Sequence, residues 1–146
     1  MSKIGVGIIG CGNISTAYLE LSPLFKSLEV RAVADIAPAA AEAQAKKFGV
    51  RAEGVADLIK AGDIDMVVNL TVPNAHYGVS RRVLDAGKHS YSEKPFVLTL
   101  EEGEALRELA TKKGLRIGSA PDTFLGGAHQ LARATLDNGK IGKVIG

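Results

Sequence analysis

Cysteine is scarce in this sequence: Cys11 is the only one among 146 residues. One cysteine forms no disulfide within the chain, so nothing points to an oxidising compartment and a cytoplasmic location is expected. Long apolar runs are missing too, since no window approaches the roughly 18 apolar residues of a membrane-spanning helix. Residues 1–7 carry no small-residue cleavage site behind an apolar run, so no signal peptide is predicted.

An excess of charge of one sign is also absent. Eighteen Lys and Arg residues oppose sixteen Asp and Glu residues, and the basic residues form nothing longer than doublets. This balance predicts neither nucleic acid nor a membrane surface as a partner. The sequence is 46% hydrophobic and 23% charged, which is typical of a soluble globular protein. Its length suffices for one domain with a sizeable core, but not for a second domain of full size.

Two hydrophobic periodicities alternate along the chain. Short apolar runs rich in β-branched residues predict strands buried on both faces of a parallel sheet, and apolar residues at helical spacing follow them. The expected strands cover residues 4–9, 30–34, 51–53, 66–70, 89–92 and 115–119. The expected helices run from the glycines after residue 9 to about Ser27, over 38–48 and 55–61, from about Val79 to Gly87, and over 99–113. Six strands alternating with helices predict an α/β fold with a doubly wound parallel sheet.

The C-terminal residues continue beyond this pattern. A further helix is expected over residues 123–139, with Asp122 as its cap, followed by a strand fragment over 143–145. That strand has no partner in the predicted order of elements.

A glycine-rich turn follows the first expected strand and opens the first helix. It covers residues 10–15 and reads GCGNIS. In a dinucleotide-binding turn the first glycine allows the tight turn, the second lets a pyrophosphate approach the backbone, and the third position, here Ser15, needs a small residue. The helix N-terminus also offers free N–H groups to phosphate. The alternative is a glycine turn without a ligand. The residues predicted to contact the dinucleotide here are Gly10, Gly12, Asn13 and Ile14.

Asp35 ends the second expected strand, twenty positions after Ser15. A carboxylate at this spacing can accept hydrogen bonds from both adenosine ribose hydroxyls and would repel a 2′-phosphate. The position therefore predicts NAD as the cofactor, with NADP less favoured. Arg31 lies inside the strand, where it should not reach the phosphate site. The alternative is that Asp35 caps the helix that begins at Pro38.

Polar residues also follow the fourth and fifth expected strands. They read TVPNAH over 71–76 and EKP over 93–95, at the carboxyl edge where doubly wound sheets bind ligands. Pro95 favours an extended Lys94, and a cis bond between them would aim the ammonium into the crevice. The alternatives are structural: Asn74 caps the next helix, His76 packs in its first turn, and Glu93 and Lys94 form a surface ion pair.

These segments together resemble one known family. Residues 10–15, 71–76 and 93–95, with LGG at 125–127 and DNGKIG at 137–142, occur in the order found in the Gfo/Idh/MocA oxidoreductases, the family of glucose-fructose oxidoreductase and inositol 2-dehydrogenase. The resemblance covers essentially the whole chain. Glu-Lys-Pro after the fifth strand, combined with Pro-Asn-x-His after the fourth, is more specific than the glycine turn. The resemblance implies a Rossmann domain that binds NAD or, less expectedly, NADP.

The resemblance also implies roles for individual residues. The implied reaction is hydride transfer between nicotinamide and a secondary hydroxyl or ketone of a sugar, polyol or related compound. Lys94 would be the catalytic residue, standing near the reacting hydroxyl, positioning it and assisting its proton transfer. No metal site is predicted. The implied cofactor-binding residues on this side of the site are Thr71, Pro73, Asn74, His76, Glu93 and Lys94.

Members of that family carry a second α/β domain, which supplies most substrate contacts and an acid/base histidine. We therefore expect residues 1–120 to form the dinucleotide-binding domain, and 121–146 a helix and the start of a truncated substrate domain. Such a chain should bind the cofactor without turnover, and the uncovered final helix should favour homo-oligomers. His89 and His129 are expected to be structural.

Two other functions compete with this one. A stand-alone dinucleotide sensor would need Gly10, Gly12 and Asp35 but would have no use for Lys94. A protein-interaction module would keep the fold and leave the cofactor site empty. The intact glycines and Asp35 favour a dinucleotide-binding function over the interaction module.

Overall fold

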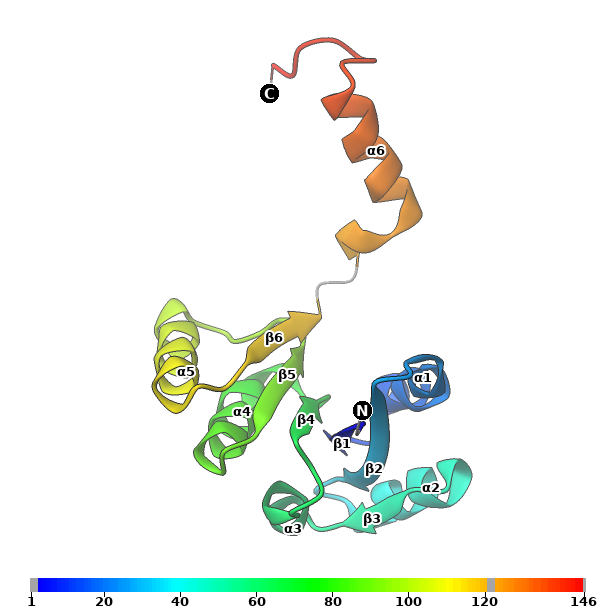
Figure 1. Cartoon of the computed structure of the whole chain (residues 1–146), viewed down its shortest axis with the longest axis vertical. Coiled ribbons are helices and arrows are strands. Elements are labelled where there is room, and N and C mark those ends of the chain that lie inside the picture. Colours follow the sequence, from blue (N-terminus) through cyan, green and yellow to red (C-terminus); the bar gives the residue numbers. More distant parts are fainter. Residues whose placement is uncertain (1–2, 121–122, 146) are drawn as a thin grey trace.

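Six parallel strands form one sheet in the described part of this chain (Figure 1). The structure is a computed structural model and describes residues 3–120 and 123–145. The strand order β3-β2-β1-β4-β5-β6 confirms the predicted doubly wound α/β fold. The strands are β1 (Ile4–Ile9), β2 (Leu28–Ala34), β3 (Arg51–Glu53), β4 (Met66–Asn69), β5 (His89–Glu93) and β6 (Ile117–Ala120).

Helices connect the strands largely where the apolar spacing predicted them. Thr99 caps α5, because its side chain accepts a hydrogen bond from the Glu102 N–H at 3.2 Å, and Gly114 ends that helix in the left-handed conformation. The helices are α1 (Asn13–Leu21), α2 (Pro38–Phe48), α3 (Val55–Lys60), α4 (His76–Asp85), α5 (Leu100–Lys113) and α6 (Gly127–Asp137). Three short 3-10 turns are η1 (Ser22–Leu24), η2 (Pro73–Ala75) and η3 (Thr123–Leu125).

Two predicted helices end or break differently in the structure. The first was expected to reach about Ser27, but α1 ends at Leu21 because Pro23 has no N–H to continue the helical ladder. The last was expected to run unbroken over 123–139, but the extended backbone of Gly126 separates η3 from α6. The expected cap, Asp122, lies outside the described residues.

The strand predicted over residues 143–145 is wrong. These residues have no regular secondary structure. A strand requires a neighbouring strand for its hydrogen bonds, and none of the described strands pairs with this segment.

Helices cover the two faces of the sheet unequally. On one face, α1 and α2 pack against β1 and β2, while on the other α3 and α4 pack against β1, β2 and β4, and α5 packs beside α4. Between α1 and strands β1, β4 and β5 the first face is hollow. A cavity of about 500 Å³ lies there, lined mainly by apolar side chains such as Ile8, Tyr18, Met66 and Tyr91.

The C-terminal helix α6 stands apart from the sheet. Figure 1 shows it beyond the carboxyl end of β6, and none of its residues is buried. Its apolar residues include Leu131, which is 69% exposed, and Leu136, which is 38% exposed. Among the helices of residues 3–120 and 123–145, none has the length and hydropathy to cross a bilayer.

Candidate dinucleotide site

The predicted site segments meet at the carboxyl edge of the sheet. Parallel pairing aligns Ile9 of β1 with Ala34 of β2 and with Asn69 of β4, and it aligns Asn69 with Ser92 of β5. The residues that follow these strands are therefore neighbours in space. The sheet thus brings together the glycine turn, Asp35, the loop before α4, and the Glu-Lys-Pro segment.

The two glycines of the turn do different things. Gly10 has φ +104°, and a Cβ at this position would lie 2.6 Å from the backbone carbonyl of Leu70, so a side chain is excluded. A Cβ on Gly12 would meet nothing within 4 Å. Gly10 therefore fits the turn against the loop after β4, whereas Gly12 leaves an open surface that a ligand can approach.

The N-terminus of α1 lies directly behind this open surface. Within the described residues, no side chain forms a capping hydrogen bond at this terminus, so its first N–H groups can serve a ligand. Asn13 and Ile14 begin the helix and are exposed. Ser15 is fully buried, and its hydroxyl donates to the Gly12 carbonyl at 2.6 Å. This serine fills the third fingerprint position without projecting toward the surface.

Cys11 lies between the two glycines and is buried. Its Sγ lies 3.5 Å from the Ala34 carbonyl oxygen. Burial, and secondarily the negative charge of Asp35, raises the pKa of this thiol to about 11. The thiol therefore stays protonated at neutral pH and is a poor nucleophile.

Asp35 ties the end of β2 to the glycine turn. Its Oδ2 accepts a hydrogen bond from the Cys11 N–H at 2.7 Å, and its Oδ1 accepts one from the Ala37 N–H at 2.8 Å. Ala37 is the N-cap residue of α2, and within the described residues no side chain caps that helix, so Asp35 holds the segment before α2 without capping the helix itself. Each carboxylate oxygen keeps a further lone pair, and Asp35 is only half-buried. The carboxylate can therefore still accept hydrogen bonds from ribose hydroxyls.

Arg31 lies inside β2, and its side chain contacts residues away from the site. Its guanidinium donates to the Asp63 carbonyl oxygen at 2.5 Å and to Glu29 at 3.1 Å. Asp63 precedes β4 and therefore lies near the amino edge of the sheet. As predicted, Arg31 is held away from the glycine turn.

The loop between β4 and α4 carries Thr71, Pro73 and Asn74. Pro73 and Asn74 are exposed, and Thr71 is half-buried. The side chain of Asn74 caps neither η2 nor α4, because α4 begins at His76 with Ala75 as its N-cap. The structure therefore does not support the capping alternative for Asn74, whose amide remains at the surface of the site.

Asn69 is a site residue that the sequence reasoning missed. It is fully buried, and its Nδ2 donates to the His76 carbonyl at 3.0 Å and to the Ser80 hydroxyl at 3.1 Å. Its Oδ1 accepts from the Thr71 hydroxyl at 2.7 Å. The available signal was an amide inside the apolar run 66–70, because a buried polar residue in a strand needs specific partners. Asn69 shapes the loop that carries Asn74.

His76 connects the two loops on this side of the site. It is 1% exposed, with Nδ1 2.6 Å from the Pro95 carbonyl oxygen and Nε2 2.9 Å from the Thr71 carbonyl oxygen. The resemblance implied a contact between His76 and the cofactor, but the buried ring instead contacts the two loops. It has no path to a ligand of its own.

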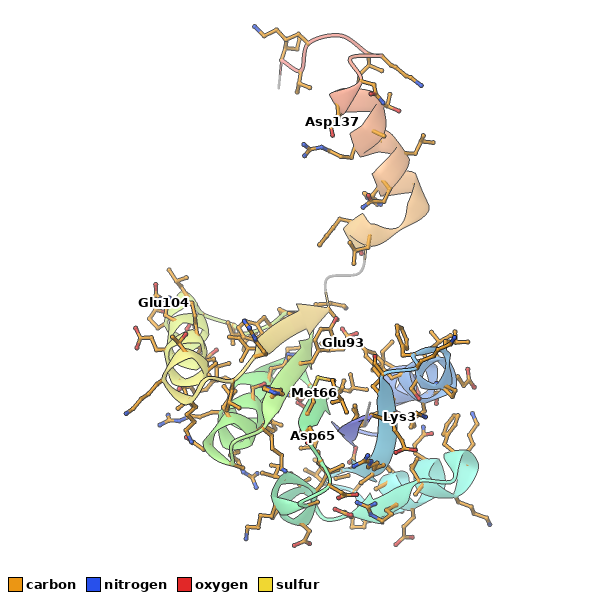
Figure 2. All side chains as sticks on the ribbon, viewed as in Figure 1. Lys3, Asp65, Met66, Glu93, Glu104 and Asp137 are labelled. Atoms are coloured by element: carbon orange, nitrogen blue, oxygen red, sulfur yellow. The ribbon has the colours of Figure 1, made fainter. Side chains whose placement is uncertain are left out.

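Glu93 is the last residue of β5, and Lys94 follows it directly. Figure 2 shows Glu93 on the side of the sheet that faces α1, and its Oε1 accepts a hydrogen bond from the Tyr18 hydroxyl at 3.1 Å. Its Oε2 accepts from the backbone N–H of Lys94 at 2.9 Å, and the Lys94–Pro95 bond is cis. Lys94 is exposed, and within the described residues no carboxylate lies within 4.0 Å of its ammonium. The surface ion pair considered as an alternative is not formed.

The remaining histidines lie outside this edge. His89 begins β5, and its Nδ1 accepts a hydrogen bond from the Arg116 N–H at 3.0 Å. His129 is exposed on α6. In the described part of the chain, no three side chains of His, Cys, Asp or Glu gather as a metal site would require.

Residues 4–120 match the GFO/IDH/MocA family, which is described as an oxidoreductase family with an NAD-binding Rossmann fold. The chain belongs to this family. The matched residues span the entire sheet, from β1 to the end of β6.

Individual relatives carry different names. The inositol 2-dehydrogenase/D-chiro-inositol 3-dehydrogenase of Lacticaseibacillus casei is 34% identical over 95% of this chain and 42% of its own length. A solved scyllo-inositol dehydrogenase from Lactobacillus casei shares 25% identity with a TM-score of 0.85, over 97% of this chain and 43% of that one. Biliverdin reductase from Synechocystis, solved with biliverdin and NADP+, shares 32% identity with a TM-score of 0.87, over 97% and 45%. The chain thus spans less than half the length of these relatives.

Proposed function

We propose that this chain binds NAD along the carboxyl edge of its sheet, as the cofactor half of an oxidoreductase that acts on a secondary alcohol or the matching ketone. The observation that carries the proposal is the joint geometry of Gly12 and Asp35. Gly12 presents an open backbone surface before a helix N-terminus, and Asp35 is hydrogen-bonded to the same turn. These are the two features that recognise the pyrophosphate and adenosine ribose of a dinucleotide.

The adenosine half would lie over the glycine turn. Backbone N–H groups of Asn13 and Ile14 would donate to the pyrophosphate, and Asp35 would accept from the ribose hydroxyls. A 2′-phosphate would meet this carboxylate instead of a cation, because Arg31 is held near the other edge. NAD is therefore the proposed cofactor in preference to NADP, although the biliverdin reductase relative was solved with NADP+.

The nicotinamide half would lie between the loop before α4 and the end of β5. Thr71, Pro73, Asn74 and Glu93 would line it. The bound nicotinamide supplies hydride transfer, and the exposed Lys94 ammonium would hold the reacting hydroxyl and assist movement of its proton. The inositol dehydrogenase relatives support a sugar or polyol as the substrate class.

Cofactor binding is tested by calorimetric titration with NADH and, separately, NADPH. We expect NADH to bind more tightly, and Asp35→Asn to weaken NADH binding by roughly 1–2 kcal/mol through loss of the charged acceptor. Asp65→Asn is a matched control, because the Asp65 Oδ2 accepts the Gly5 N–H at 2.7 Å near the other end of β1. It should leave NADH affinity unchanged. Tighter binding of NADPH, or equal losses in both variants, would contradict the proposal.

Turnover is expected to require residues beyond this chain, because the relatives are more than twice as long. We expect the chain alone to give no NADH from NAD and myo-inositol. Joined to the remaining residues of the inositol dehydrogenase relative, it should gain activity, and Lys94→Ala should then lower kcat about 10²-fold or more while NADH affinity is retained. Lys112→Ala, an exposed lysine on α5, is the control.

A stand-alone dinucleotide sensor is the competing function. For a sensor we also expect Asp35→Asn to weaken NADH binding, but Lys94 would have no role. A joined protein that binds NADH but shows no turnover with Lys94 in place would favour the sensor. Turnover that survives Lys94→Ala would contradict the role proposed for Lys94.

A further inference from the structure

The ring of His76 faces two hydrogen-bond acceptors at once. Nδ1 lies 2.6 Å from the Pro95 carbonyl oxygen, and Nε2 lies 2.9 Å from the Thr71 carbonyl oxygen. A backbone carbonyl can only accept, so each ring nitrogen must donate if both contacts are hydrogen bonds. The ring is 1% exposed, so water does not offer a substitute partner.

A neutral imidazole meets only half of this demand. It carries one N–H, so its other nitrogen would direct a lone pair at a carbonyl oxygen inside the protein, which is an unfavourable buried contact. The imidazolium carries an N–H on both nitrogens and satisfies both carbonyls. Hydrogen bonds from a cation are also shorter than those from neutral donors, in keeping with the 2.6 Å contact to Pro95.

We propose that His76 is held as an imidazolium that clamps the loop carrying Thr71 to the loop carrying Pro95. Pro73 and Asn74 follow Thr71, and Lys94 precedes Pro95, so the clamp fixes the spacing between the two walls of the nicotinamide half. His76 is then a positioning residue. Only this consequence for the site rests on the function proposed above; the protonation state stands on the two contacts.

The ring of His76 contacts backbone carbonyl groups rather than carboxylates. The charged residues on the segments that it joins and on its own helix are Glu93, Lys94, Arg81, Arg82 and Asp85. Within the described residues, no carboxylate lies within 4.0 Å of a His76 ring nitrogen. The backbone of His76 is fixed as well, because its own carbonyl accepts from the Asn69 side chain at 3.0 Å. The dipoles of two fixed carbonyls therefore hold the cation in place of a counter-ion.

The protonation state is measured directly on the free chain, without any cofactor. Nitrogen-15 NMR of the three histidine rings, recorded near neutral pH and assigned with single His→Gln variants, separates imidazolium from the two neutral tautomers. We expect two slowly exchanging ring N–H groups for His76. His89 is the internal comparison, because its Nδ1 accepts a hydrogen bond from the Arg116 N–H. One protonated and one unprotonated nitrogen in His76 would overturn the proposal.

The clamp is tested by amide hydrogen exchange in His76→Gln, with His129→Gln on the exposed helix α6 as the control. A glutamine reaches one loop at most, so we expect exchange in residues 71–75 and 94–97 to speed up together by about tenfold or more. An increase confined to the first turn of α4 would show a local packing role and overturn the clamp. Failure of the wild-type chain to bind NADH would contradict the proposed function but leave both of these readouts intact.

Discussion

Helices α4 and α6 are built alike but end in different surroundings. Each places apolar residues along one side, yet α4 buries His76, Ser80, Val83 and Leu84 whereas α6 buries none of its residues. The difference lies in the neighbours: α4 packs against β4, β5 and α5, and α6 makes its main contacts with η3 alone. Amphipathic spacing therefore predicts that a helix has an apolar side to bury. The tertiary fold determines whether a neighbouring element covers that side.

Helices α4 and α6 also differ in their contribution to the candidate site. The covered helix holds the buried polar groups that shape the site, because Asn69 and the two site loops bond to its first turns. The exposed helix bears no residue of the candidate site. Two carboxylates labelled in Figure 2 illustrate this difference: Asp137 lies on α6, where it pairs with Arg133 of the same helix, whereas Glu93 lies on the side of the sheet that faces α1 and accepts a hydrogen bond from Tyr18 of that helix.

The largest expected effect contrasts one leucine from each helix. Leu84 is fully buried and Leu131 is 69% exposed. Leu84→Ala should lower the free energy of unfolding by about 3 kcal/mol through lost burial and a residual cavity. Leu131→Ala should change it by about 0.5 kcal/mol or less. Urea denaturation measures both, and equal losses would mean that α6 is packed in solution.

Buried and exposed residues also lie side by side in the glycine turn, where Cys11 is buried and the neighbouring Gly12 is exposed. Its folded pKa of about 11 exceeds the ordinary value of 9.0, so the unfolded chain ionises first as pH rises. The contribution of this thiol to stability is therefore full below pH 9.0 and declines toward pH 11 by up to about 2 kcal/mol.

The matching measurement is urea denaturation of the wild type and Cys11→Ala at a series of pH values. Lysines and tyrosines titrate in both proteins, so only the difference between the two curves reports on the thiol. A difference that stays constant from pH 8 to pH 11 would contradict the raised pKa.

Removing residues 121–146 is expected to have only a small energetic effect. The sheet and its covering helices lie within residues 3–120, so the free energy of unfolding should change by about 1 kcal/mol or less. Self-association should nevertheless decrease, because the exposed leucines of α6 are removed. Light scattering over a range of concentrations compares the two chains. A longer chain that stays monomeric at high concentration would contradict the expected homo-oligomer.

Residues with local signals were predictable from the sequence, and those that depend on tertiary contacts were not. Apolar runs placed strands such as β1 and β4, whereas β3, which reads RAE, and β5, which reads HSYSE, were placed by the alternation of strands with helices. The glycine turn and Asp35 meet at the carboxyl edge of the sheet. The contacts of Asn69 join residues that a strand and two loops bring together, so no local pattern showed them. The strand predicted over 143–145 fails for the same reason, since its formation depends on a partner strand rather than on its own residues.

For protein engineering, the two bonds from Asp35 to the backbone change how its cofactor preference should be altered. Removing the carboxylate to admit NADPH also releases the N–H groups of Cys11 and Ala37. A redesign should therefore keep a short acceptor, as in Asp35→Ser, and bring the phosphate-binding cation from the adjacent Ile36, which is 95% exposed. Ile36→Arg would add that cation at a position whose side chain packs against little of the fold. The preference would then change from NADH to NADPH while the glycine turn keeps its shape.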